Sequence, residues 1–353
     1  LHPHAATPDP LWSRGLGDVY KRQLSLRSRS LINKPTFVSL GDPSGIGPEV
    51  FIKAIKDQRL RQHLSKIILV SSPKVIEGAI SALDVKQKIN PISDVNEAQP
   101  DSVNLINIDG CQDFVLGKPT FKNSNFIIEC LSTAADLALK NSSSLVTGPL
   151  NKSIIQKHIQ NFTGHTEFLK KKFNANEVLM YMTNGNLHLG ITTTHVPLRV
   201  VPNVISRDLI KNKYKLLHHG LIDIFKLANP KIAVLGINPH AGEFGTIGDE
   251  EQNVIMPAID ELQHEGYDAN GPISADTVFT QTKYDAVLSM YHDQALPVLK
   301  AIDFYKTVNI TLGLPFLRVS VDHGTAEDIA KSYSANYESM MEALLISIAR
   351  NEA

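Results

Sequence analysis

From residue 35 onward, short apolar runs alternate with polar turns along the chain. Three of these runs, at 286–290, 308–312 and 317–321, are rich in β-branched and aliphatic residues, which is typical of strands covered on both faces. Polar and charged side chains stand directly at their ends. Because open α/β sheets bind ligands at strand ends, the segment 289–326 is predicted to carry the functional site. The alternative is an ordinary buried sheet whose Lys and Arg side chains reach solvent.

The rest of the chain shows the same alternation of strands and helices. Strand-like runs lie at 36–40, 66–70, 103–106, 144–147, 178–183, 188–194 and 231–237, and helix-like runs at 74–83, 125–140, 207–227 and 336–350. This order predicts an α/β fold with parallel strands. A chain of 353 residues exceeds the usual size of one core, so we expect two α/β/α domains flanking a cleft.

Charge and cysteine content exclude several classes of protein. Lys and Arg number 35 against 36 Asp and Glu, so nothing calls for nucleic acid or an anionic membrane as a partner. The apolar runs are too short to span a bilayer. Cys111 and Cys130 cannot build a disulfide framework, and we expect both to be reduced in a cytoplasmic protein.

The first residues differ from the rest of the chain. Residues 1–23 contain three prolines and the single Trp without an apolar period, and they are interpreted as a non-native or disordered extension. The run 17–23 resembles translated adapter or vector sequence. A transit peptide is the alternative, because 12–34 is rich in Arg and Ser.

Three histidines stand out because each follows a β-rich run directly: His195, His240 and His292. That position places an imidazole at the end of a strand. The three are much further apart in sequence than the ligands of recognisable zinc motifs. The pattern therefore leaves open both a three-histidine metal site and ordinary core or surface histidines.

Other residues are suited to binding an anion. His165 and Thr166 follow a glycine at an expected helix start, and Lys300 and Arg318 add positive charge. The glycine-rich turn 41–49 matches neither nucleotide-binding pattern. Its glycines indicate either a close backbone approach to a ligand or a tight strand-to-helix turn.

Taken together, these motifs closely resemble the family of 4-hydroxythreonine-4-phosphate dehydrogenases of pyridoxal phosphate biosynthesis. The resemblance runs from about residue 35 to the C-terminus and depends on GDPSGIGPE, VTGPLNK, FTGHTEF, TTHVPLR, GINPHAGE, GTIGDEE, GPISADT, MYHDQALPVLK, VNITLGLPFLR and VDHGTAEDIA, in that order. A wider similarity to the isocitrate and isopropylmalate dehydrogenases lies in GIGPEV and HGTAEDIA, and it implies their fold.

The resemblance implies NAD-dependent oxidation of 4-phosphooxy-L-threonine at C3, followed by decarboxylation to 3-amino-2-oxopropyl phosphate. Erythronate 4-phosphate is the alternative substrate. The family implies a homodimer with the active site at its interface. Residues 24–145 with 300–353 would form the cofactor-side domain, and 146–299 the metal-binding and dimerisation domain.

The resemblance also assigns residues to roles. One divalent ion (zinc, cobalt, magnesium or manganese) would be bound by His195, His240 and His292, with ligands from both subunits. Substrate would be held by His165, Thr166, Lys300, Asn309 and Arg318. Our choice of general base is Asp276, with a metal-bound water and Lys300 as alternatives, and Asp276 could instead support a ligand histidine.

The cofactor is expected to bind the loop that begins at His323. Gly324 and Asp328 would contact the adenosine half, with the Asp328 carboxylate at the ribose and Asn336 near adenine. A carboxylate there favours NAD over NADP, although NADP stays possible. Asp328 could instead cap a following helix. A metal-dependent hydrolase and a non-catalytic phosphometabolite-binding protein are the alternatives from other classes.

Overall fold

The computed structural model describes residues 34–157, 159–160, 162–281 and 283–353. Residues 1–23, with the interpretations made of them, lie outside this part of the chain. Among the described residues, no helix is both long and apolar enough to cross a membrane.

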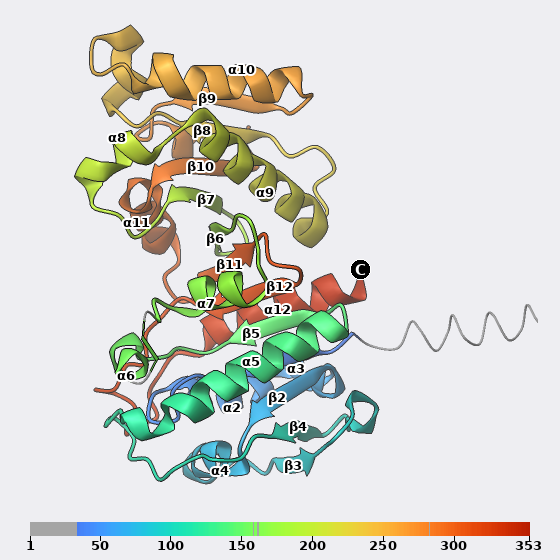
Figure 1. The fold of residues 1–353 in the computed structure, drawn as a ribbon. Coiled ribbons are helices and arrows are strands. Elements are labelled where there is room, and N and C mark those ends of the chain that lie inside the picture. The colour runs from blue at the N-terminus through green and yellow to red at the C-terminus, as the bar shows by residue number, and fades with distance from the viewer. Residues whose placement is uncertain (1–33, 158, 161, 282) are drawn as a thin grey trace, which may run out of the picture.

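One twelve-stranded sheet runs through the whole described molecule (Figure 1). In sheet order its strands are β3 (Lys88–Pro91), β4 (Ser102–Asn107), β2 (Ile67–Ser71), β1 (Thr36–Ser39), β5 (Ser144–Thr147), β12 (Leu317–Val321), β11 (Val308–Leu312), β6 (Leu179–Thr183), β7 (His188–Thr193), β10 (Ala286–Tyr291), β8 (Ile232–Leu235) and β9 (Ala269–Ile273). The C-terminal strands β11 and β12 therefore lie at its centre, between segments from the first and middle parts of the chain.

The sheet is mixed, which corrects the expectation of parallel strands. Both outer parts are parallel, but the central pairs β12–β11, β11–β6 and β6–β7 are antiparallel. The reason lies in the connections, because residues 184–187 and 313–316 are hairpin links. Links this short join neighbouring strands only in antiparallel fashion. Gly185 and Gly313 have φ values of +89° and +97°, which suit these turns.

Helices cover both faces of the sheet, which explains why its strands are so apolar. The helices are α2 (Gly47–Lys56), α3 (Gln58–Arg61), α4 (Pro73–Ala82), α5 (Ser124–Lys140), α6 (Lys152–Gln156), α7 (His165–Lys172), α8 (Val201–Val204), α9 (Arg207–Phe225), α10 (Met256–His264), α11 (His292–Ile302) and α12 (Glu338–Glu352). In the lower half of Figure 1, α5 packs on β1 and β5, and α12 packs beside α2 on the other face. In the upper half, α9 and α11 lie on opposite faces.

Most predicted elements agree with the structure to within two residues at each end. The α/β class is confirmed. Helix α11 was missed because Pro297 lies inside it, and proline usually ends a helix. Here Leu296 and Leu299 of that helix are buried against β7 and β10, and tertiary packing outweighs the local preference. The division into two domains stays a prediction.

Candidate active site

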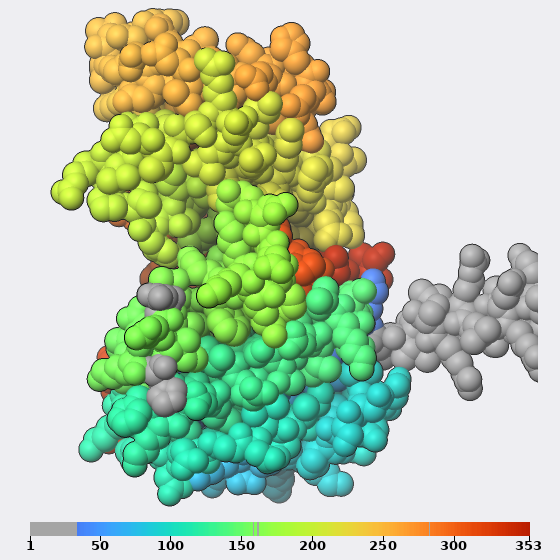
Figure 2. Space-filling view, in the orientation of Figure 1, coloured from blue at the N-terminus to red at the C-terminus, as the bar shows by residue number. Residues whose placement is uncertain are grey.

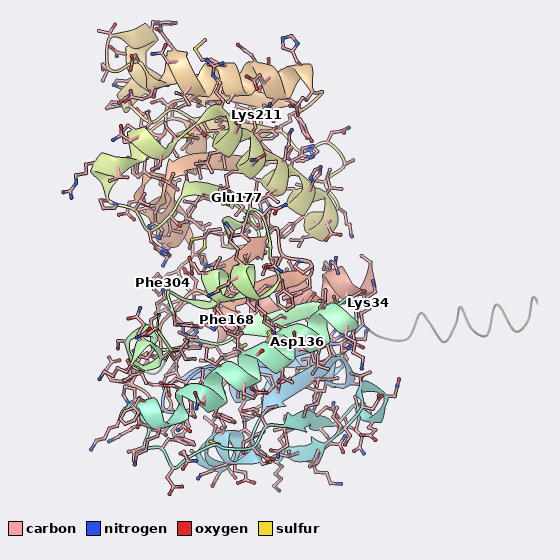
Figure 3. The ribbon with its side chains drawn as sticks, viewed as in Figure 1. Lys34, Asp136, Phe168, Glu177, Lys211 and Phe304 are labelled. Carbon is pink, nitrogen blue, oxygen red and sulfur yellow. The ribbon has the colours of Figure 1, made fainter. Side chains whose placement is uncertain are left out.

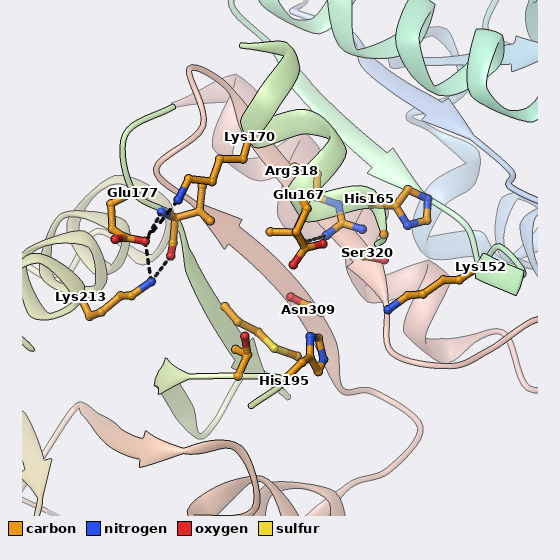
Figure 4. Close-up of a pocket in the computed structure, with 15 residues that line it drawn as sticks. Lys152, His165, Glu167, Lys170, Glu177, His195, Lys213, Asn309, Arg318 and Ser320 are labelled. Carbon is orange, nitrogen blue, oxygen red and sulfur yellow. Dashed lines mark hydrogen bonds and ion pairs between the residues drawn. The ribbon is translucent and has the colours of Figure 1, made fainter. Parts of the chain in front are cut away.

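A pocket of about 380 Å³ lies beside the central strands of the sheet. The surface is hollowed in this region, between the yellow-green and green halves of Figure 2. Five of the predicted site residues line the pocket: His165, Thr166, His195, Asn309 and Arg318. The other charged residues of its lining were not predicted, and they are Lys152, Glu167, Lys170, Glu177 and Lys213 (Figure 4).

Arg318 on β12 is a buried cation, with only 2% of its surface exposed. Its guanidinium donates to the hydroxyls of Thr147 at 2.8 and 3.1 Å, of Thr311 at 2.9 Å and of Thr166 at 3.4 Å. Burial lowers the pKa of Arg318 to about 10. Within the described chain its hydrogen bonds go only to hydroxyls, so its charge has no bonded counterion. A buried guanidinium of this kind favours an anionic ligand.

The first turn of α7 brings two more donors to the same place. Gly164 precedes the helix with φ +150°, and a Cβ there would lie 3.2 Å from Lys152 Cε. Burial and the positive charges of Arg318 and Lys152 hold the pKa of His165 well below its usual range. The His165 ring is therefore neutral. It stands with Thr166 at a helix N-terminus, where anions bind favourably.

An ion-pair cluster closes the far side of the pocket. Lys213 of α9 lies 2.8 Å from the Glu177 carboxylate, and Lys170 of α7 lies 3.8 Å from it. Figure 3 shows Glu177 between the two halves of the molecule. The pKa of Glu177 is lowered by these lysines against the opposing effect of burial. The cluster thus connects α7, which presents His165, to α9 of the upper half.

Two of the three predicted metal ligands lie close together. The ring centroids of His195 and His292 are 6.0 Å apart. Burial, followed by the charge of Lys152, lowers the pKa of His195 and keeps the ring neutral, which is the form that binds metals. His292 is the first residue of α11, and its Nδ1 lies 2.6 Å from Asp293 Oδ1. Both rings therefore stand where β7 and β10 end.

The third predicted ligand, His240, lies elsewhere in the chain. It belongs to the turn Pro239–Gly245, in which His240 to Phe244 all have left-handed φ values. His240 lies near Asp276. The pKa of the Asp276 carboxylate is lowered mainly by the hydrogen bond from Ser274, and the proximity of His240 lowers it further. Within the described residues, no group of three or more His, Cys, Asp or Glu side chains could hold a metal. One chain thus brings two of the three imidazoles together.

Lys300 does not line the pocket. Its ammonium forms an ion pair of 2.9 Å with Asp322 and lies 5.4 Å from the centroid of the Phe304 ring. Burial raises the pKa of Asp322, and the hydrogen bond from Lys300 opposes that effect. Lys300 lies in the last turn of α11, and His292 is the first residue of the same helix. The contact of Lys300 with substrate stays a prediction.

The glycine-rich turn supports the predicted cofactor loop. The Ile46 N–H donates to the Thr325 carbonyl at 3.0 Å, and a Cβ at Gly45 would lie 2.8 Å from that oxygen. Thr325 donates to Glu327 at 2.7 Å. The glycine at 45 thus allows one protein loop to approach another, which supports the tight-turn reading over direct ligand approach.

The predicted cofactor residues lie on the same side of the molecule as this turn. Gly324 and Asp328 are exposed. No helix begins at Asp328, since the next helix among the described residues is α12, so the capping alternative is wrong. Instead Asn336 accepts a hydrogen bond of 2.8 Å from the Glu338 N–H at the start of α12. Asn336 also lines a groove with Lys53 and Tyr305.

Some of the pocket residues could have been found in the sequence. Lys152 and Glu167 lie inside two of the motifs quoted above, VTGPLNK and FTGHTEF, and Glu167 directly follows Thr166, which was singled out. Lys213 offers no such signal. It lies in an ordinary amphipathic helix and reaches the pocket only because α9 packs across β6 and β7.

The chain has an α/β fold with a polar pocket beside the central strands of its sheet. At the level of fold, the chain is similar to a terephthalate 1,2-cis-dihydrodiol dehydrogenase from Burkholderia xenovorans LB400. The identity is 22%, the TM-score is 0.63, and the match covers 89% of this chain and 97% of that one.

A more specific family is shown by residues 63–347, which match the model of the pyridoxal phosphate biosynthetic protein PdxA. The chain belongs to this family. It is similar to a 4-hydroxythreonine-4-phosphate dehydrogenase from Klebsiella pneumoniae, with 32% identity, a TM-score of 0.83, and coverage of 91% of this chain and 99% of that one. A putative 4-hydroxythreonine-4-phosphate dehydrogenase from Salmonella typhimurium has 32% identity and a TM-score of 0.81, and the match covers 90% of this chain and 99% of that one. For the enzyme from Burkholderia phymatum the identity is 31% and the TM-score 0.79, with coverage of 90% of this chain and 98% of that one.

Proposed function

We propose that this chain is a 4-hydroxythreonine-4-phosphate dehydrogenase. It would oxidise 4-phosphooxy-L-threonine at C3 with NAD and then release carbon dioxide to give 3-amino-2-oxopropyl phosphate. The observation that carries the proposal is the buried Arg318 guanidinium, which has only hydroxyl partners and lines the same pocket as His195. The family match and the three similar dehydrogenases supply the chemistry to which this pocket is suited.

The end of the pocket around Arg318 is suited to the phosphate. The fork of the guanidinium matches two phosphate oxygens, which would displace some of its threonine partners. The neutral His165 ring and the Thr166 hydroxyl add uncharged donors at the N-terminus of α7. Because water is largely excluded from Arg318, each contact is stronger than it would be at the surface. The phosphate would thereby fix the position of C3 relative to the histidine end.

The reaction removes a hydride from C3 and a proton from its hydroxyl. NAD, when bound, accepts the hydride together with its electron pair. The proton passes to a base, for which we propose Asp276, a carboxylate that lies near His240. The C3 ketone is then β to the carboxylate. The C1–C2 bond breaks, carbon dioxide leaves, and C2 takes up a proton.

The metal site would be completed by a second subunit. His195 and His292 are suitable nitrogen ligands, but two ligands from one chain do not make a catalytic site. We infer a homodimer in which His240 of the partner subunit joins them. The exposed apolar side chains of Phe244 (99%) and Leu198 (65%) support an interface on this side. When bound, zinc, cobalt, magnesium or manganese would supply a Lewis acid near the C3 hydroxyl.

The cofactor would bind on the side of the glycine-rich turn. We propose that Gly324 and Asp328 contact the adenosine half and that Asn336, whose oxygen already caps α12, offers its amide N–H groups to adenine. The division into a cofactor-side domain of 24–145 with 300–353 and a metal-binding domain of 146–299 belongs to the same proposal. A role for Lys300 in substrate binding requires that it release Asp322. A cytoplasmic location stays a prediction from the sequence.

The deciding assay measures NAD reduction at 340 nm with the phosphorylated substrate and a divalent metal. Oxidation of 4-phosphooxy-L-threonine supports the proposal, and stoichiometric carbon dioxide release supports the second step. Preferential oxidation of erythronate 4-phosphate would establish the alternative substrate. Phosphate release without NAD reduction would indicate a hydrolase, and binding without turnover a non-catalytic protein.

A further inference from the structure

The pocket is lined by two carboxylates, and only one of them is neutralised. Glu177 is held by Lys213 and Lys170, as described above. Glu167 lies in the first turn of α7, and among the described residues it has no hydrogen-bonding partner and no ion pair. An unpaired carboxylate in a pocket for a phosphate and a carboxylate would repel both of these groups. Glu167 is exposed, so a positively charged group of the ligand can reach it and offset this repulsion.

The geometry places the Glu167 carboxylate inside the pocket. A Cβ built on Gly164 would lie 3.3 Å from Glu167 Oε2 and 3.4 Å from Lys152 Nζ, so both groups stand above the start of α7. The negative charge of Glu167 also acts on Arg318 and on His195, whose pKa values it raises against the dominant effect of burial. Glu167 thus stands between the anion-binding end and the histidine end.

A second acceptor faces the same space. The Oδ1 atom of Asn309 on β11 is buried and has no hydrogen-bonding partner among the described residues. Figure 4 shows the Glu167 carboxylate and the Asn309 side chain both directed into the region between Arg318 and His195. Two acceptors without a donor of their own are suited to a group that carries several N–H bonds.

We propose that the Glu167 carboxylate accepts hydrogen bonds from the α-ammonium group of the substrate. This contact would determine specificity for phosphorylated hydroxy amino acids. The inference rests on the proposed function and goes further, because it names the residue that distinguishes the amino substrate from its hydroxy analogue. A hydroxyl in place of the ammonium group offers a single neutral donor. A charge-assisted hydrogen bond is roughly twice as strong as a neutral one, and the hydroxy substrate would leave the carboxylate uncompensated.

The test compares two substrates on three proteins. Values of kcat/KM for 4-phosphooxy-L-threonine and erythronate 4-phosphate are measured at fixed NAD and metal for the parent, Glu167→Gln and Glu177→Gln. Glu167→Gln keeps the shape of the side chain and removes its charge. We expect it to lower the preference for the amino substrate by roughly tenfold to a hundredfold. Glu177→Gln is the matched control from the same pocket and should leave that preference unchanged.

The outcomes separate this inference from the proposed function. Equal effects of Glu167→Gln on both substrates, or no effect on either, would overturn the role of Glu167 while leaving the dehydrogenase activity of the parent established. Loss of bound metal in Glu167→Gln would also overturn it, because the residue would then act as a ligand. A parent that prefers erythronate 4-phosphate would contradict both the proposed substrate and the role of Glu167.

Discussion

The two ends of the pocket are built in different ways. At the anion-binding end, Arg318 is fixed by Thr147 on β5, Thr311 on β11 and Thr166 on α7, all within one chain. At the other end, His195 and His292 stand at strand ends, while His240 lies on an exposed left-handed turn. The side chains that fix Arg318 at the first end all come from the sheet and α7 of the same chain. In the proposed homodimer, the second end would be completed only by assembly.

The largest effect should come from the exposed turn. His240→Ala is expected to reduce kcat by at least roughly a thousandfold, because a catalytic metal with a missing ligand is poorly held and badly oriented. Metal content should fall in parallel. The melting temperature should change little, because His240 is exposed.

The matched control for that change is Glu243→Ala, which lies in the same turn, is also exposed and shares the left-handed backbone (φ 41° against 53°). It imposes the same backbone cost without removing a ligand, so activity should survive. If His240→Ala retained full metal and normal turnover, the assignment of this end of the pocket to a shared metal would be wrong.

Sequence patterns predicted the strands that carry the first end but not the contacts between distant segments, for physical reasons. The strands at 308–312 and 317–321 carry Asn309 and Arg318, and their limits follow from local apolar runs bounded by turns. Contacts such as that between Arg318 and Thr147 depend on the register of β5 and β12, which are far apart in sequence. The resemblance assigned His240 to the metal site, but the sequence around His240 does not indicate in which subunit that site would lie. Lys300 stays a predicted substrate contact, and nothing in the sequence indicated its ion pair with Asp322.

The second effect concerns Arg318. Arg318→Lys keeps a cation but loses the fork, so kcat/KM for the phosphorylated substrate should fall by about a hundredfold, which corresponds to roughly two charge-assisted contacts. A dephosphorylated analogue should lose little. The control is Arg350→Lys, whose guanidinium pairs with Asp223 at 3.1 Å outside this pocket. Equal losses on both compounds would show that Arg318 does not recognise the phosphate.

A buried histidine gives a third, smaller effect that concerns stability and not catalysis. The ring of His188 on β7 packs against Phe225 with the ring centroids 4.5 Å apart, and its Nδ1 lies 2.5 Å from the Tyr181 hydroxyl. Burial lowers the pKa of His188 to about 4. Between the unfolded pKa near 6.5 and this value, the unfolded chain takes up a proton that the folded chain does not. The free energy of unfolding should therefore fall by about 3 kcal/mol as pH decreases across this window.

The measurement is urea unfolding at pH 7 and pH 4 for the parent and His188→Gln, which cannot titrate there. A smaller loss of stability in the variant on acidification would agree with the prediction. An identical pH dependence in both proteins would mean that other groups dominate. Neither outcome bears on the metal, so the experiment isolates the core of the sheet from the exposed turn.

The smallest effect concerns the choice of cofactor. Asp328→Lys should shift the ratio of kcat/KM for NAD and NADP toward NADP by about tenfold, because a lysine attracts the 2′-phosphate that a carboxylate repels. Asp328 is exposed and caps no helix, so the fold should not suffer. Lys331→Asp, a charge reversal of the opposite sign three residues on, is the control. An unchanged ratio in Asp328→Lys would remove this residue from the ribose site.

The burial of Arg318 among threonine hydroxyls also has a consequence for the lifetime of the protein. A guanidinium that is 98% withdrawn from water without a bonded counterion costs stability until an anion arrives. Any phosphate compound that binds there stabilises the folded state in proportion to the logarithm of its concentration. Proteolysis that proceeds through unfolding would then slow as substrate accumulates. The metabolite would regulate how long its own enzyme persists, in addition to how fast it turns over.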